Sequence, residues 1–155
     1  MTAPSQDVRR PLLGLPVWGL LLLAALALPR AVVHDLGVDV GPVVNAVLAL
    51  APPAVWVLVA LRARVPSPVT TLVVVGALYG IGLGVEHNLL WDEVFEESPR
   101  LGGSFEGDLS PGAEETVMRV VTFASSVFTG ALVGLVAGLV ATLLRRVGGS
   151  DGARR

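Results

Sequence analysis

The sequence has no cysteine and no lysine, and it is poor in charged and aromatic residues. The absence of cysteine excludes disulfides, thiolate metal sites, haem attachment through thioethers and cysteine nucleophiles. Charged residues make up only 15% of the 155 residues, whereas soluble domains have about 25%. Hydrophobic residues make up 53%, and the mean hydropathy is +0.72. Such a chain cannot cover its apolar surface with polar groups in water, so we expect it to fold in a lipid bilayer.

Four apolar runs are long enough to cross a membrane as helices, which requires about 20 residues each. They cover approximately residues 12–33, 43–61, 69–91 and 118–144. These runs are apolar on every face, whereas the strands of a membrane β-barrel alternate between apolar and polar residues. The sequence therefore predicts an all-α integral membrane protein with one domain, a bundle of four transmembrane helices.

The arginines predict the orientation of the bundle. They flank the first span, fill the loop between the second and third spans and follow the fourth: Arg9, Arg10, Arg62, Arg64, Arg145, Arg146, Arg154 and Arg155. The loop 92–117 is strongly acidic instead. Positive charge in short flanking segments marks the cytoplasmic side. We expect a multi-pass protein of a bacterial cytoplasmic (inner) membrane, with cytoplasmic tails at 1–10 and 145–155 and an external acidic loop at 92–117.

The first span is also compatible with a signal peptide. It has a basic start and an apolar body, and Ala25-Leu26-Ala27 resembles a cleavage site for removal of residues 1–27. The sequence leaves this alternative open, and the orientation of the other three spans is the same in both cases.

Proline and glycine predict how the helices pack. Pro52 and Pro53 lie in the middle of the second span, where they remove backbone donors and are expected to kink or interrupt the helix. Small residues four positions apart let two membrane helices approach closely. Two such series are present, Gly76, Gly80 and Gly84 in the third span and Gly130, Gly134 and Gly138 in the fourth. We expect the third and fourth helices to pack through these glycine ladders, on each other or on copies in an oligomer.

The start of the fourth helix can be predicted from local signals. Ser110 suits the N-cap and Pro111 the first helical position, about two turns before the membrane. Glu115 and Arg119 are four residues apart and are expected to pair on the helix surface. Asn45, in the second span, is expected to form an interhelical hydrogen bond.

Polar residues are expected to gather at the outer rim of the bundle: Arg30, His34, Asp35, Glu86, His87, Asn88, Asp92 and Arg119. Three interpretations are open. The first is an ion-pair network in which Arg30 or Arg119 neutralises Glu86. The second is a metal site built on His34 and His87, although no histidine spacing fixes two ligands on one helix. The third is a pH-sensitive gate, because imidazole titrates near neutrality.

No motif in the sequence indicates an enzyme, a cofactor or a nucleic-acid partner, and we expect none of these. No acidic residue lies near the middle of a span, where transporters commonly place one. The first hypothesis is therefore a non-enzymatic structural or accessory subunit that contacts the lipid bilayer and a partner membrane protein or copies of itself. The alternative is a small homo-oligomeric transporter or channel with an ion or proton site at the outer rim.

Overall fold

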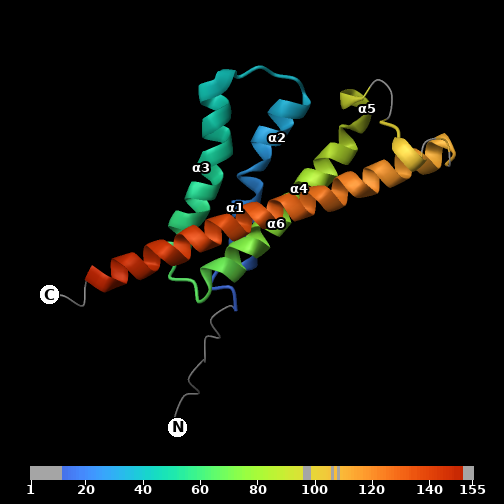
Figure 1. Cartoon of the computed structure of the whole chain (residues 1–155). Coiled ribbons are helices and arrows are strands. Elements are labelled where there is room, and N and C mark those ends of the chain that lie inside the picture. Colours follow the sequence, from blue (N-terminus) through green and yellow to red (C-terminus); the bar gives the residue numbers. More distant parts are fainter. Residues whose placement is uncertain (1–11, 96–98, 106, 108, 152–155) are drawn as a thin grey trace, which may run out of the picture.

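The protein is a bundle of helices (Figure 1). The computed structural model describes residues 12–95, 99–105, 107 and 109–151, and all regular secondary structure in these ranges is helical. Within this part of the chain, four helical segments are long and apolar enough to cross a membrane. This confirms the predicted class, a helical multi-pass membrane protein. The predicted tail 1–10, the end of the predicted tail 145–155 and parts of the acidic loop lie outside the described residues.

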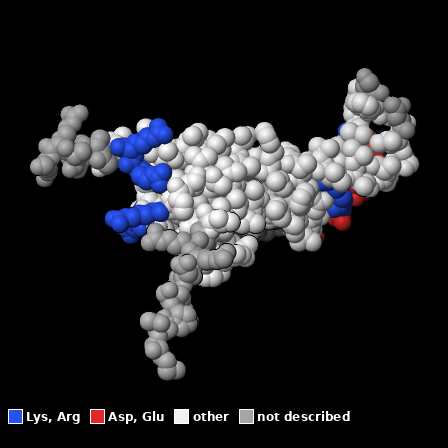
Figure 2. Space-filling model, turned by 90° about the horizontal axis from the view of Figure 1, so that it is seen from below, with Lys and Arg blue, Asp and Glu red and all other residues white. Residues whose placement is uncertain are grey.

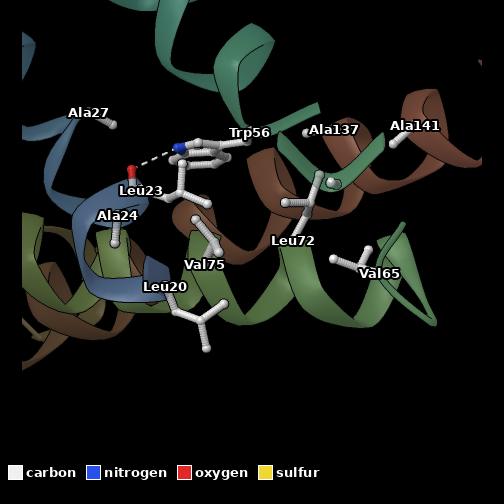
Figure 3. Close-up of a cluster of buried hydrophobic side chains, with 11 residues drawn as sticks. Leu20, Leu23, Ala24, Ala27, Trp56, Val65, Leu72, Val75, Ala137 and Ala141 are labelled. Atoms are coloured by element: carbon white, nitrogen blue, oxygen red, sulfur yellow. Dashed lines mark hydrogen bonds between the residues drawn. The ribbon is translucent and has the colours of Figure 1, made fainter. Parts of the chain in front are cut away.

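The first span differs from the single helix predicted over 12–33. It consists of α1 (Val17–Ala25) and α2 (Leu28–Asp35), separated by a turn. In this turn the N–H of Ala27 donates to the carbonyl of Ala24, so the Leu23 carbonyl lacks the partner that a regular helix would supply. The indole N–H of Trp56 donates to that carbonyl over 2.7 Å (Figure 3). Interrupted backbone at membrane depth requires such a partner within the protein.

The second span is α3 (Gly41–Arg62), which is helical without a break through Pro52 and Pro53. The prolines therefore do not interrupt the helix, and the kink expected there stays a prediction. Pro52 is buried in the bundle, whereas Pro53 lines a groove between α3 and the last helix. Membrane helices tolerate proline where neighbouring elements cover the freed backbone groups.

The third and fourth spans are α4 (Pro68–Leu89) and α6 (Pro111–Asp151), which run antiparallel and form the most extensive helix pair. Glycines of each helix lie against the backbone of the other. A Cβ atom added to Gly76, Gly80, Gly130 or Gly134 would lie closer than 3.0 Å to backbone atoms across the interface. Gly138 opposes the Val69 backbone in the same way, and Gly84 faces Phe123.

The start of α6 at Pro111 confirms the prediction from local signals. Glu115 and Arg119 form the predicted pair, with 2.8 Å between the Glu115 carboxylate and the Arg119 Nε. Two short helices, α5 (Trp91–Val94) and the 3-10 helix η1 (Gly103–Phe105), lie within the predicted acidic loop. The N–H of Leu101 donates to the Glu114 carboxylate and so attaches this loop to the first turn of α6.

The buried core lies where α1, α3, α4 and α6 meet (Figure 3). Its members are apolar and come from all four spans and from the α3–α4 loop: Leu20, Leu23, Ala24, Ala27, Trp56, Ala60, Val65, Leu72, Val75, Ala137 and Ala141. Trp56 and Leu72 are fully buried within it. By contrast, the first half of α3 exposes large apolar side chains, including Val43 and Leu50.

Charged residues separate to the two ends of the bundle (Figure 2). On the face shown, arginines gather at one end, which we call the arginine end, and an uncharged band separates them from acidic and basic residues at the other, the polar end. The arginine end joins three segments. The Thr71 hydroxyl donates to the Leu13 carbonyl over 2.9 Å, and Arg145 donates to the Val65 carbonyl over 3.1 Å. The chain before α1, the α3–α4 loop and the last turns of α6 therefore lie at the same end.

Candidate functional site

The eight residues of the predicted outer cluster all lie at the polar end, where the structure arranges them in two groups. One group lies between α2 and α4. The other lies where α4 and α5 face α6. The α2–α4 group contains Arg30, His34, Asp35, Glu86 and His87. The second contains Asn88, Asp92 and Arg119.

Asp35 is the centre of the α2–α4 group. Its carboxylate oxygens face two imidazoles: Nδ1 of His34 lies 3.3 Å from one oxygen, and Nδ1 of His87 contacts the other. The Asp35 side chain is only 8% exposed, whereas those of His87 and His34 are 29% and 77% exposed. The Asp35 carboxylate is therefore largely shielded from solvent and faces an imidazole nitrogen at each of its two oxygens.

Glu86 lies next to this pair, and the predicted pairing with an arginine is wrong. Among the described residues, neither Arg30 nor Arg119 forms an ion pair with it, and both of its carboxylate oxygens are buried without a hydrogen-bond partner. The Nε atom of Arg30 is buried and unpartnered as well. Helical spacing could place both residues at the polar end, but it could not fix the direction in which two long side chains turn. A buried carboxylate without a donor is energetically costly and marks a candidate site.

Arg119 organises the second group. Its guanidinium donates to the Glu115 carboxylate over 2.8 Å, to the Asn88 backbone carbonyl over 2.9 Å and to the Asp92 carboxylate over 3.2 Å. The same guanidinium lies over the Trp91 ring, 4.8 Å from its centroid. The Asn88 side chain donates to the Gly84 carbonyl of its own helix. This group therefore joins the end of α4 to α6, which is a structural role.

Two cavities open at the polar end. One, of about 240 Å³, is lined by His34, Asp35 and His87 together with aromatic residues that include Trp91 and Phe95. The other, of about 340 Å³, lies between α2 and the start of α3; we call it the Arg30 cavity. Arg30, His34, Asp39 and Asn45 supply its polar lining. His34 lines both cavities.

The two histidines face different oxygens of the Asp35 carboxylate. In the described part of the chain, no group of three or more histidine, aspartate or glutamate residues is placed to hold a metal ion.

Trp91 is a site residue that the predicted cluster lacked. It is the last residue of the third predicted span, so the sequence indicated only the end of a membrane helix there, although it lies one turn from His87 and Asn88.

No family model matches the sequence, and neither a curated protein nor a solved structure was found to be similar to it.

Proposed function

We propose that the chain is a non-enzymatic accessory subunit of a bacterial cytoplasmic membrane, with both termini in the cytoplasm, that works by packing against a partner membrane protein. The observation that carries this proposal concerns polar groups in the spans. Trp56, Thr71, Ser126 and Thr142 each donate to a backbone carbonyl of the same chain. Their hydrogen bonds are used within the fold, so these residues offer neither a reactive group nor a continuous polar path across the bundle.

The charge distribution supports the proposed orientation. The arginine end contains Arg62, Arg64, Arg145 and Arg146, and arginine-rich ends face the cytoplasm. The hydrogen bonds to Leu13 and from Arg145 at that end support this orientation, because they put the start of the described chain and the last turns of α6 on one side of the bundle. The close approach of α4 and α6 supports the further proposal that the glycine ladders hold this pair together in lipid.

A row of large apolar residues on α6 points to the packing surface. Val121, Phe128, Leu132, Leu139 and Leu143 are exposed, and their spacing places them on one side of the helix. The glycines that meet α4 lie on a different side of α6. A partner helix could therefore pack on this row without disturbing the α4–α6 pair.

Site-specific photocrosslinking in cells tests the accessory role. A photoreactive residue at Phe128 or Leu139 should crosslink to one transmembrane segment of another membrane protein, identified by mass spectrometry of the joined peptides. The matched control is a photoreactive residue at Leu22, an exposed apolar position on α1, which should not give that product. Crosslinks only to lipid, or to the same extent from all three positions, would contradict the proposal.

A second candidate function is a proton- or ion-coupled transporter or channel, most simply as a homo-oligomer. Glu86 favours it, because a buried carboxylate without a donor beside the Asp35–His87 pair is the kind of group that such proteins use. This candidate predicts that proteoliposomes containing the protein transport protons under an imposed membrane potential, as measured with an internal pH dye. The flux should be lost in Glu86→Gln and retained in Glu93→Gln, a control at the same end. Flux no higher than in empty vesicles would contradict it.

A further inference from the structure

The Arg30 cavity combines a positive group with an acidic one. Arg30 lines the cavity, and because its Nε is closed off from solvent, the rest of the guanidinium is the part that an anion can reach. Asp39 lines the same cavity, and one of its carboxylate oxygens accepts a 2.8 Å hydrogen bond from the N–H of Gly41. The predicted interhelical hydrogen bond of Asn45 is not formed within the described chain, and the exposed Asn45 side chain lines the cavity instead. The cavity therefore has a donor for an anion and a carboxylate for a cation.

The start of α3 already faces an acidic group of this chain. The helix begins at Gly41 on the wall of the cavity, and the Asp39 carboxylate that accepts from the Gly41 N–H lies at its positive end. The Arg30 guanidinium also lines the cavity, and a guanidinium pairs well with phosphate oxygens, so Arg30 is the group that would bind a phosphate-sized anion here.

A shallow, open apolar groove, lined by side chains of α3 alone, continues from this cavity. Pro42 lines both the cavity and the groove, which has a volume of about 580 Å³ and is formed by Val43, Ala46, Val47, Leu50 and Ala51. At Ala54 it meets a second apolar groove, of about 430 Å³, between α3 and α6.

The length of the first groove matches an acyl chain. From Pro42 to Ala54 the helix rises about 18 Å at 1.5 Å per residue, and half of the hydrocarbon core of a bilayer is about 15 Å thick. A chain that starts at the polar end would fill this groove and reach the second one near the middle of the bilayer. A polar cavity at headgroup level that continues into an apolar groove of this length fits an amphiphile.

We propose that this surface binds one membrane phospholipid with an amine headgroup, such as phosphatidylethanolamine. The phosphate pairs with Arg30 at the start of α3, the ammonium group faces Asp39, and one acyl chain lies along α3 from Pro42 towards Ala54. The site is distinct from the Asp35–His87 contact, and the proposal holds for both functions considered above.

Native mass spectrometry of the full chain released from nanodiscs tests the proposal. The nanodiscs contain equal amounts of phosphatidylethanolamine and phosphatidylglycerol, and the spectrum gives the fraction of protein that retains each lipid. The wild type should retain one phosphatidylethanolamine. Arg30→Ala should retain it about tenfold less tightly, equivalent to about 1.4 kcal/mol. Arg64→Ala, the same change at the arginine end, should behave as the wild type does.

Two further variants distinguish lipid binding from a folding defect. Ala46 is exposed in the groove, so Ala46→Trp should fill the groove, reduce retention and leave the unfolding temperature unchanged. Asp39→Asn keeps an acceptor for Gly41 but removes the charge, so it should shift retention towards phosphatidylglycerol. Equal retention by the wild type, Arg30→Ala and Ala46→Trp would overturn the proposal. Preference of the wild type for phosphatidylglycerol would overturn the assignment of the headgroup.

Discussion

The indole nitrogen of Trp56 donates a 2.7 Å hydrogen bond to the backbone carbonyl of Leu23, 33 residues earlier in the chain. This contact connects α3 to the point at which the first span is interrupted. The carbonyl is available because Ala27 donates to Ala24 instead. It is also the only place in the described core where a side chain of one span stabilises a broken helix of another.

Trp56→Phe tests this contact, because it keeps an aromatic ring in the core and removes the donor together with part of the indole. A buried carbonyl left without a partner costs about 1–3 kcal/mol, and the smaller ring also loses packing contacts, so the free energy of unfolding in detergent should fall by at least that amount. Circular dichroism during denaturant titration measures it. Trp18→Phe is the control, since Trp18 is 67% exposed, and it should have little effect. Equal effects of the two variants would contradict the role of the Trp56 hydrogen bond.

Gly130→Ala tests the close approach of α4 and α6. The added Cβ would lie closer than 3.0 Å to backbone atoms of Gly76 and Gly80, and backbone of a packed helix cannot turn away as a side chain can. Separating the helices should cost about 1–3 kcal/mol or more. Gly112→Ala, in the same helix, is the control, because a Cβ there meets open space. This control should raise stability by up to about 1 kcal/mol, the usual gain of alanine over glycine in a helix. A neutral Gly130→Ala would show that the two helices are further apart than described.

Arg119→Lys tests whether the Arg119 guanidinium holds the end of α4 against α6 at the polar end. A lysine ammonium cannot contact Glu115, the Asn88 carbonyl and Asp92 together while it lies over Trp91. We expect faster hydrogen exchange of the backbone amides from Asn88 to Trp91, as measured by mass spectrometry. Asp92→Asn serves for comparison: its carboxylate is 91% exposed, and exposed ion pairs contribute about 0–1 kcal/mol. Unchanged exchange in Arg119→Lys would show that α5 is held by other contacts.

Two carboxylates of the α2–α4 group should respond in opposite ways to neutralisation. Glu86→Gln removes a buried charge that has no partner, so the free energy of unfolding at neutral pH should stay the same or rise. Asp35→Asn removes the charge that faces His34 and His87, so stability should fall by about 1–3 kcal/mol. Thermal unfolding of both variants in one detergent measures this difference. A large loss of stability in Glu86→Gln would mean that Glu86 has a stabilising partner.

Local rules predicted those parts of the molecule that depend on neighbouring residues. Pro111 begins α6 because proline suits a first helical position. Glu115 pairs with Arg119 because residues four apart share one side of a helix. The four spans followed from the lengths of the apolar runs alone, since covering the hydrocarbon core requires such runs.

Features that depend on contacts between distant segments could not be predicted in this way. The turn after Ala25 follows from Pro29, which lies in the first turn of α2 and cannot donate to the Ala25 carbonyl. The hydrogen bond from Trp56 to the Leu23 carbonyl could not be predicted, because Trp56 lies on another helix. Similarly, the residues of the predicted cluster lie at one end of the bundle, but the lack of a partner for Glu86 depends on how α2 and α4 are rotated against each other. The sequence pattern predicts where a residue lies along its own helix, but it does not predict how two helices are rotated against each other.

Both proposed functions require four spans with both termini in the cytoplasm, and dual topology reporters test this arrangement most directly. Fusions are made after Arg64, after Arg146 and between Gly102 and Gly107, each to a reporter active only in the cytoplasm and to one active only outside it. We expect cytoplasmic activity after Arg64 and Arg146 and external activity between Gly102 and Gly107. External activity after Arg146 would contradict the four-span bundle.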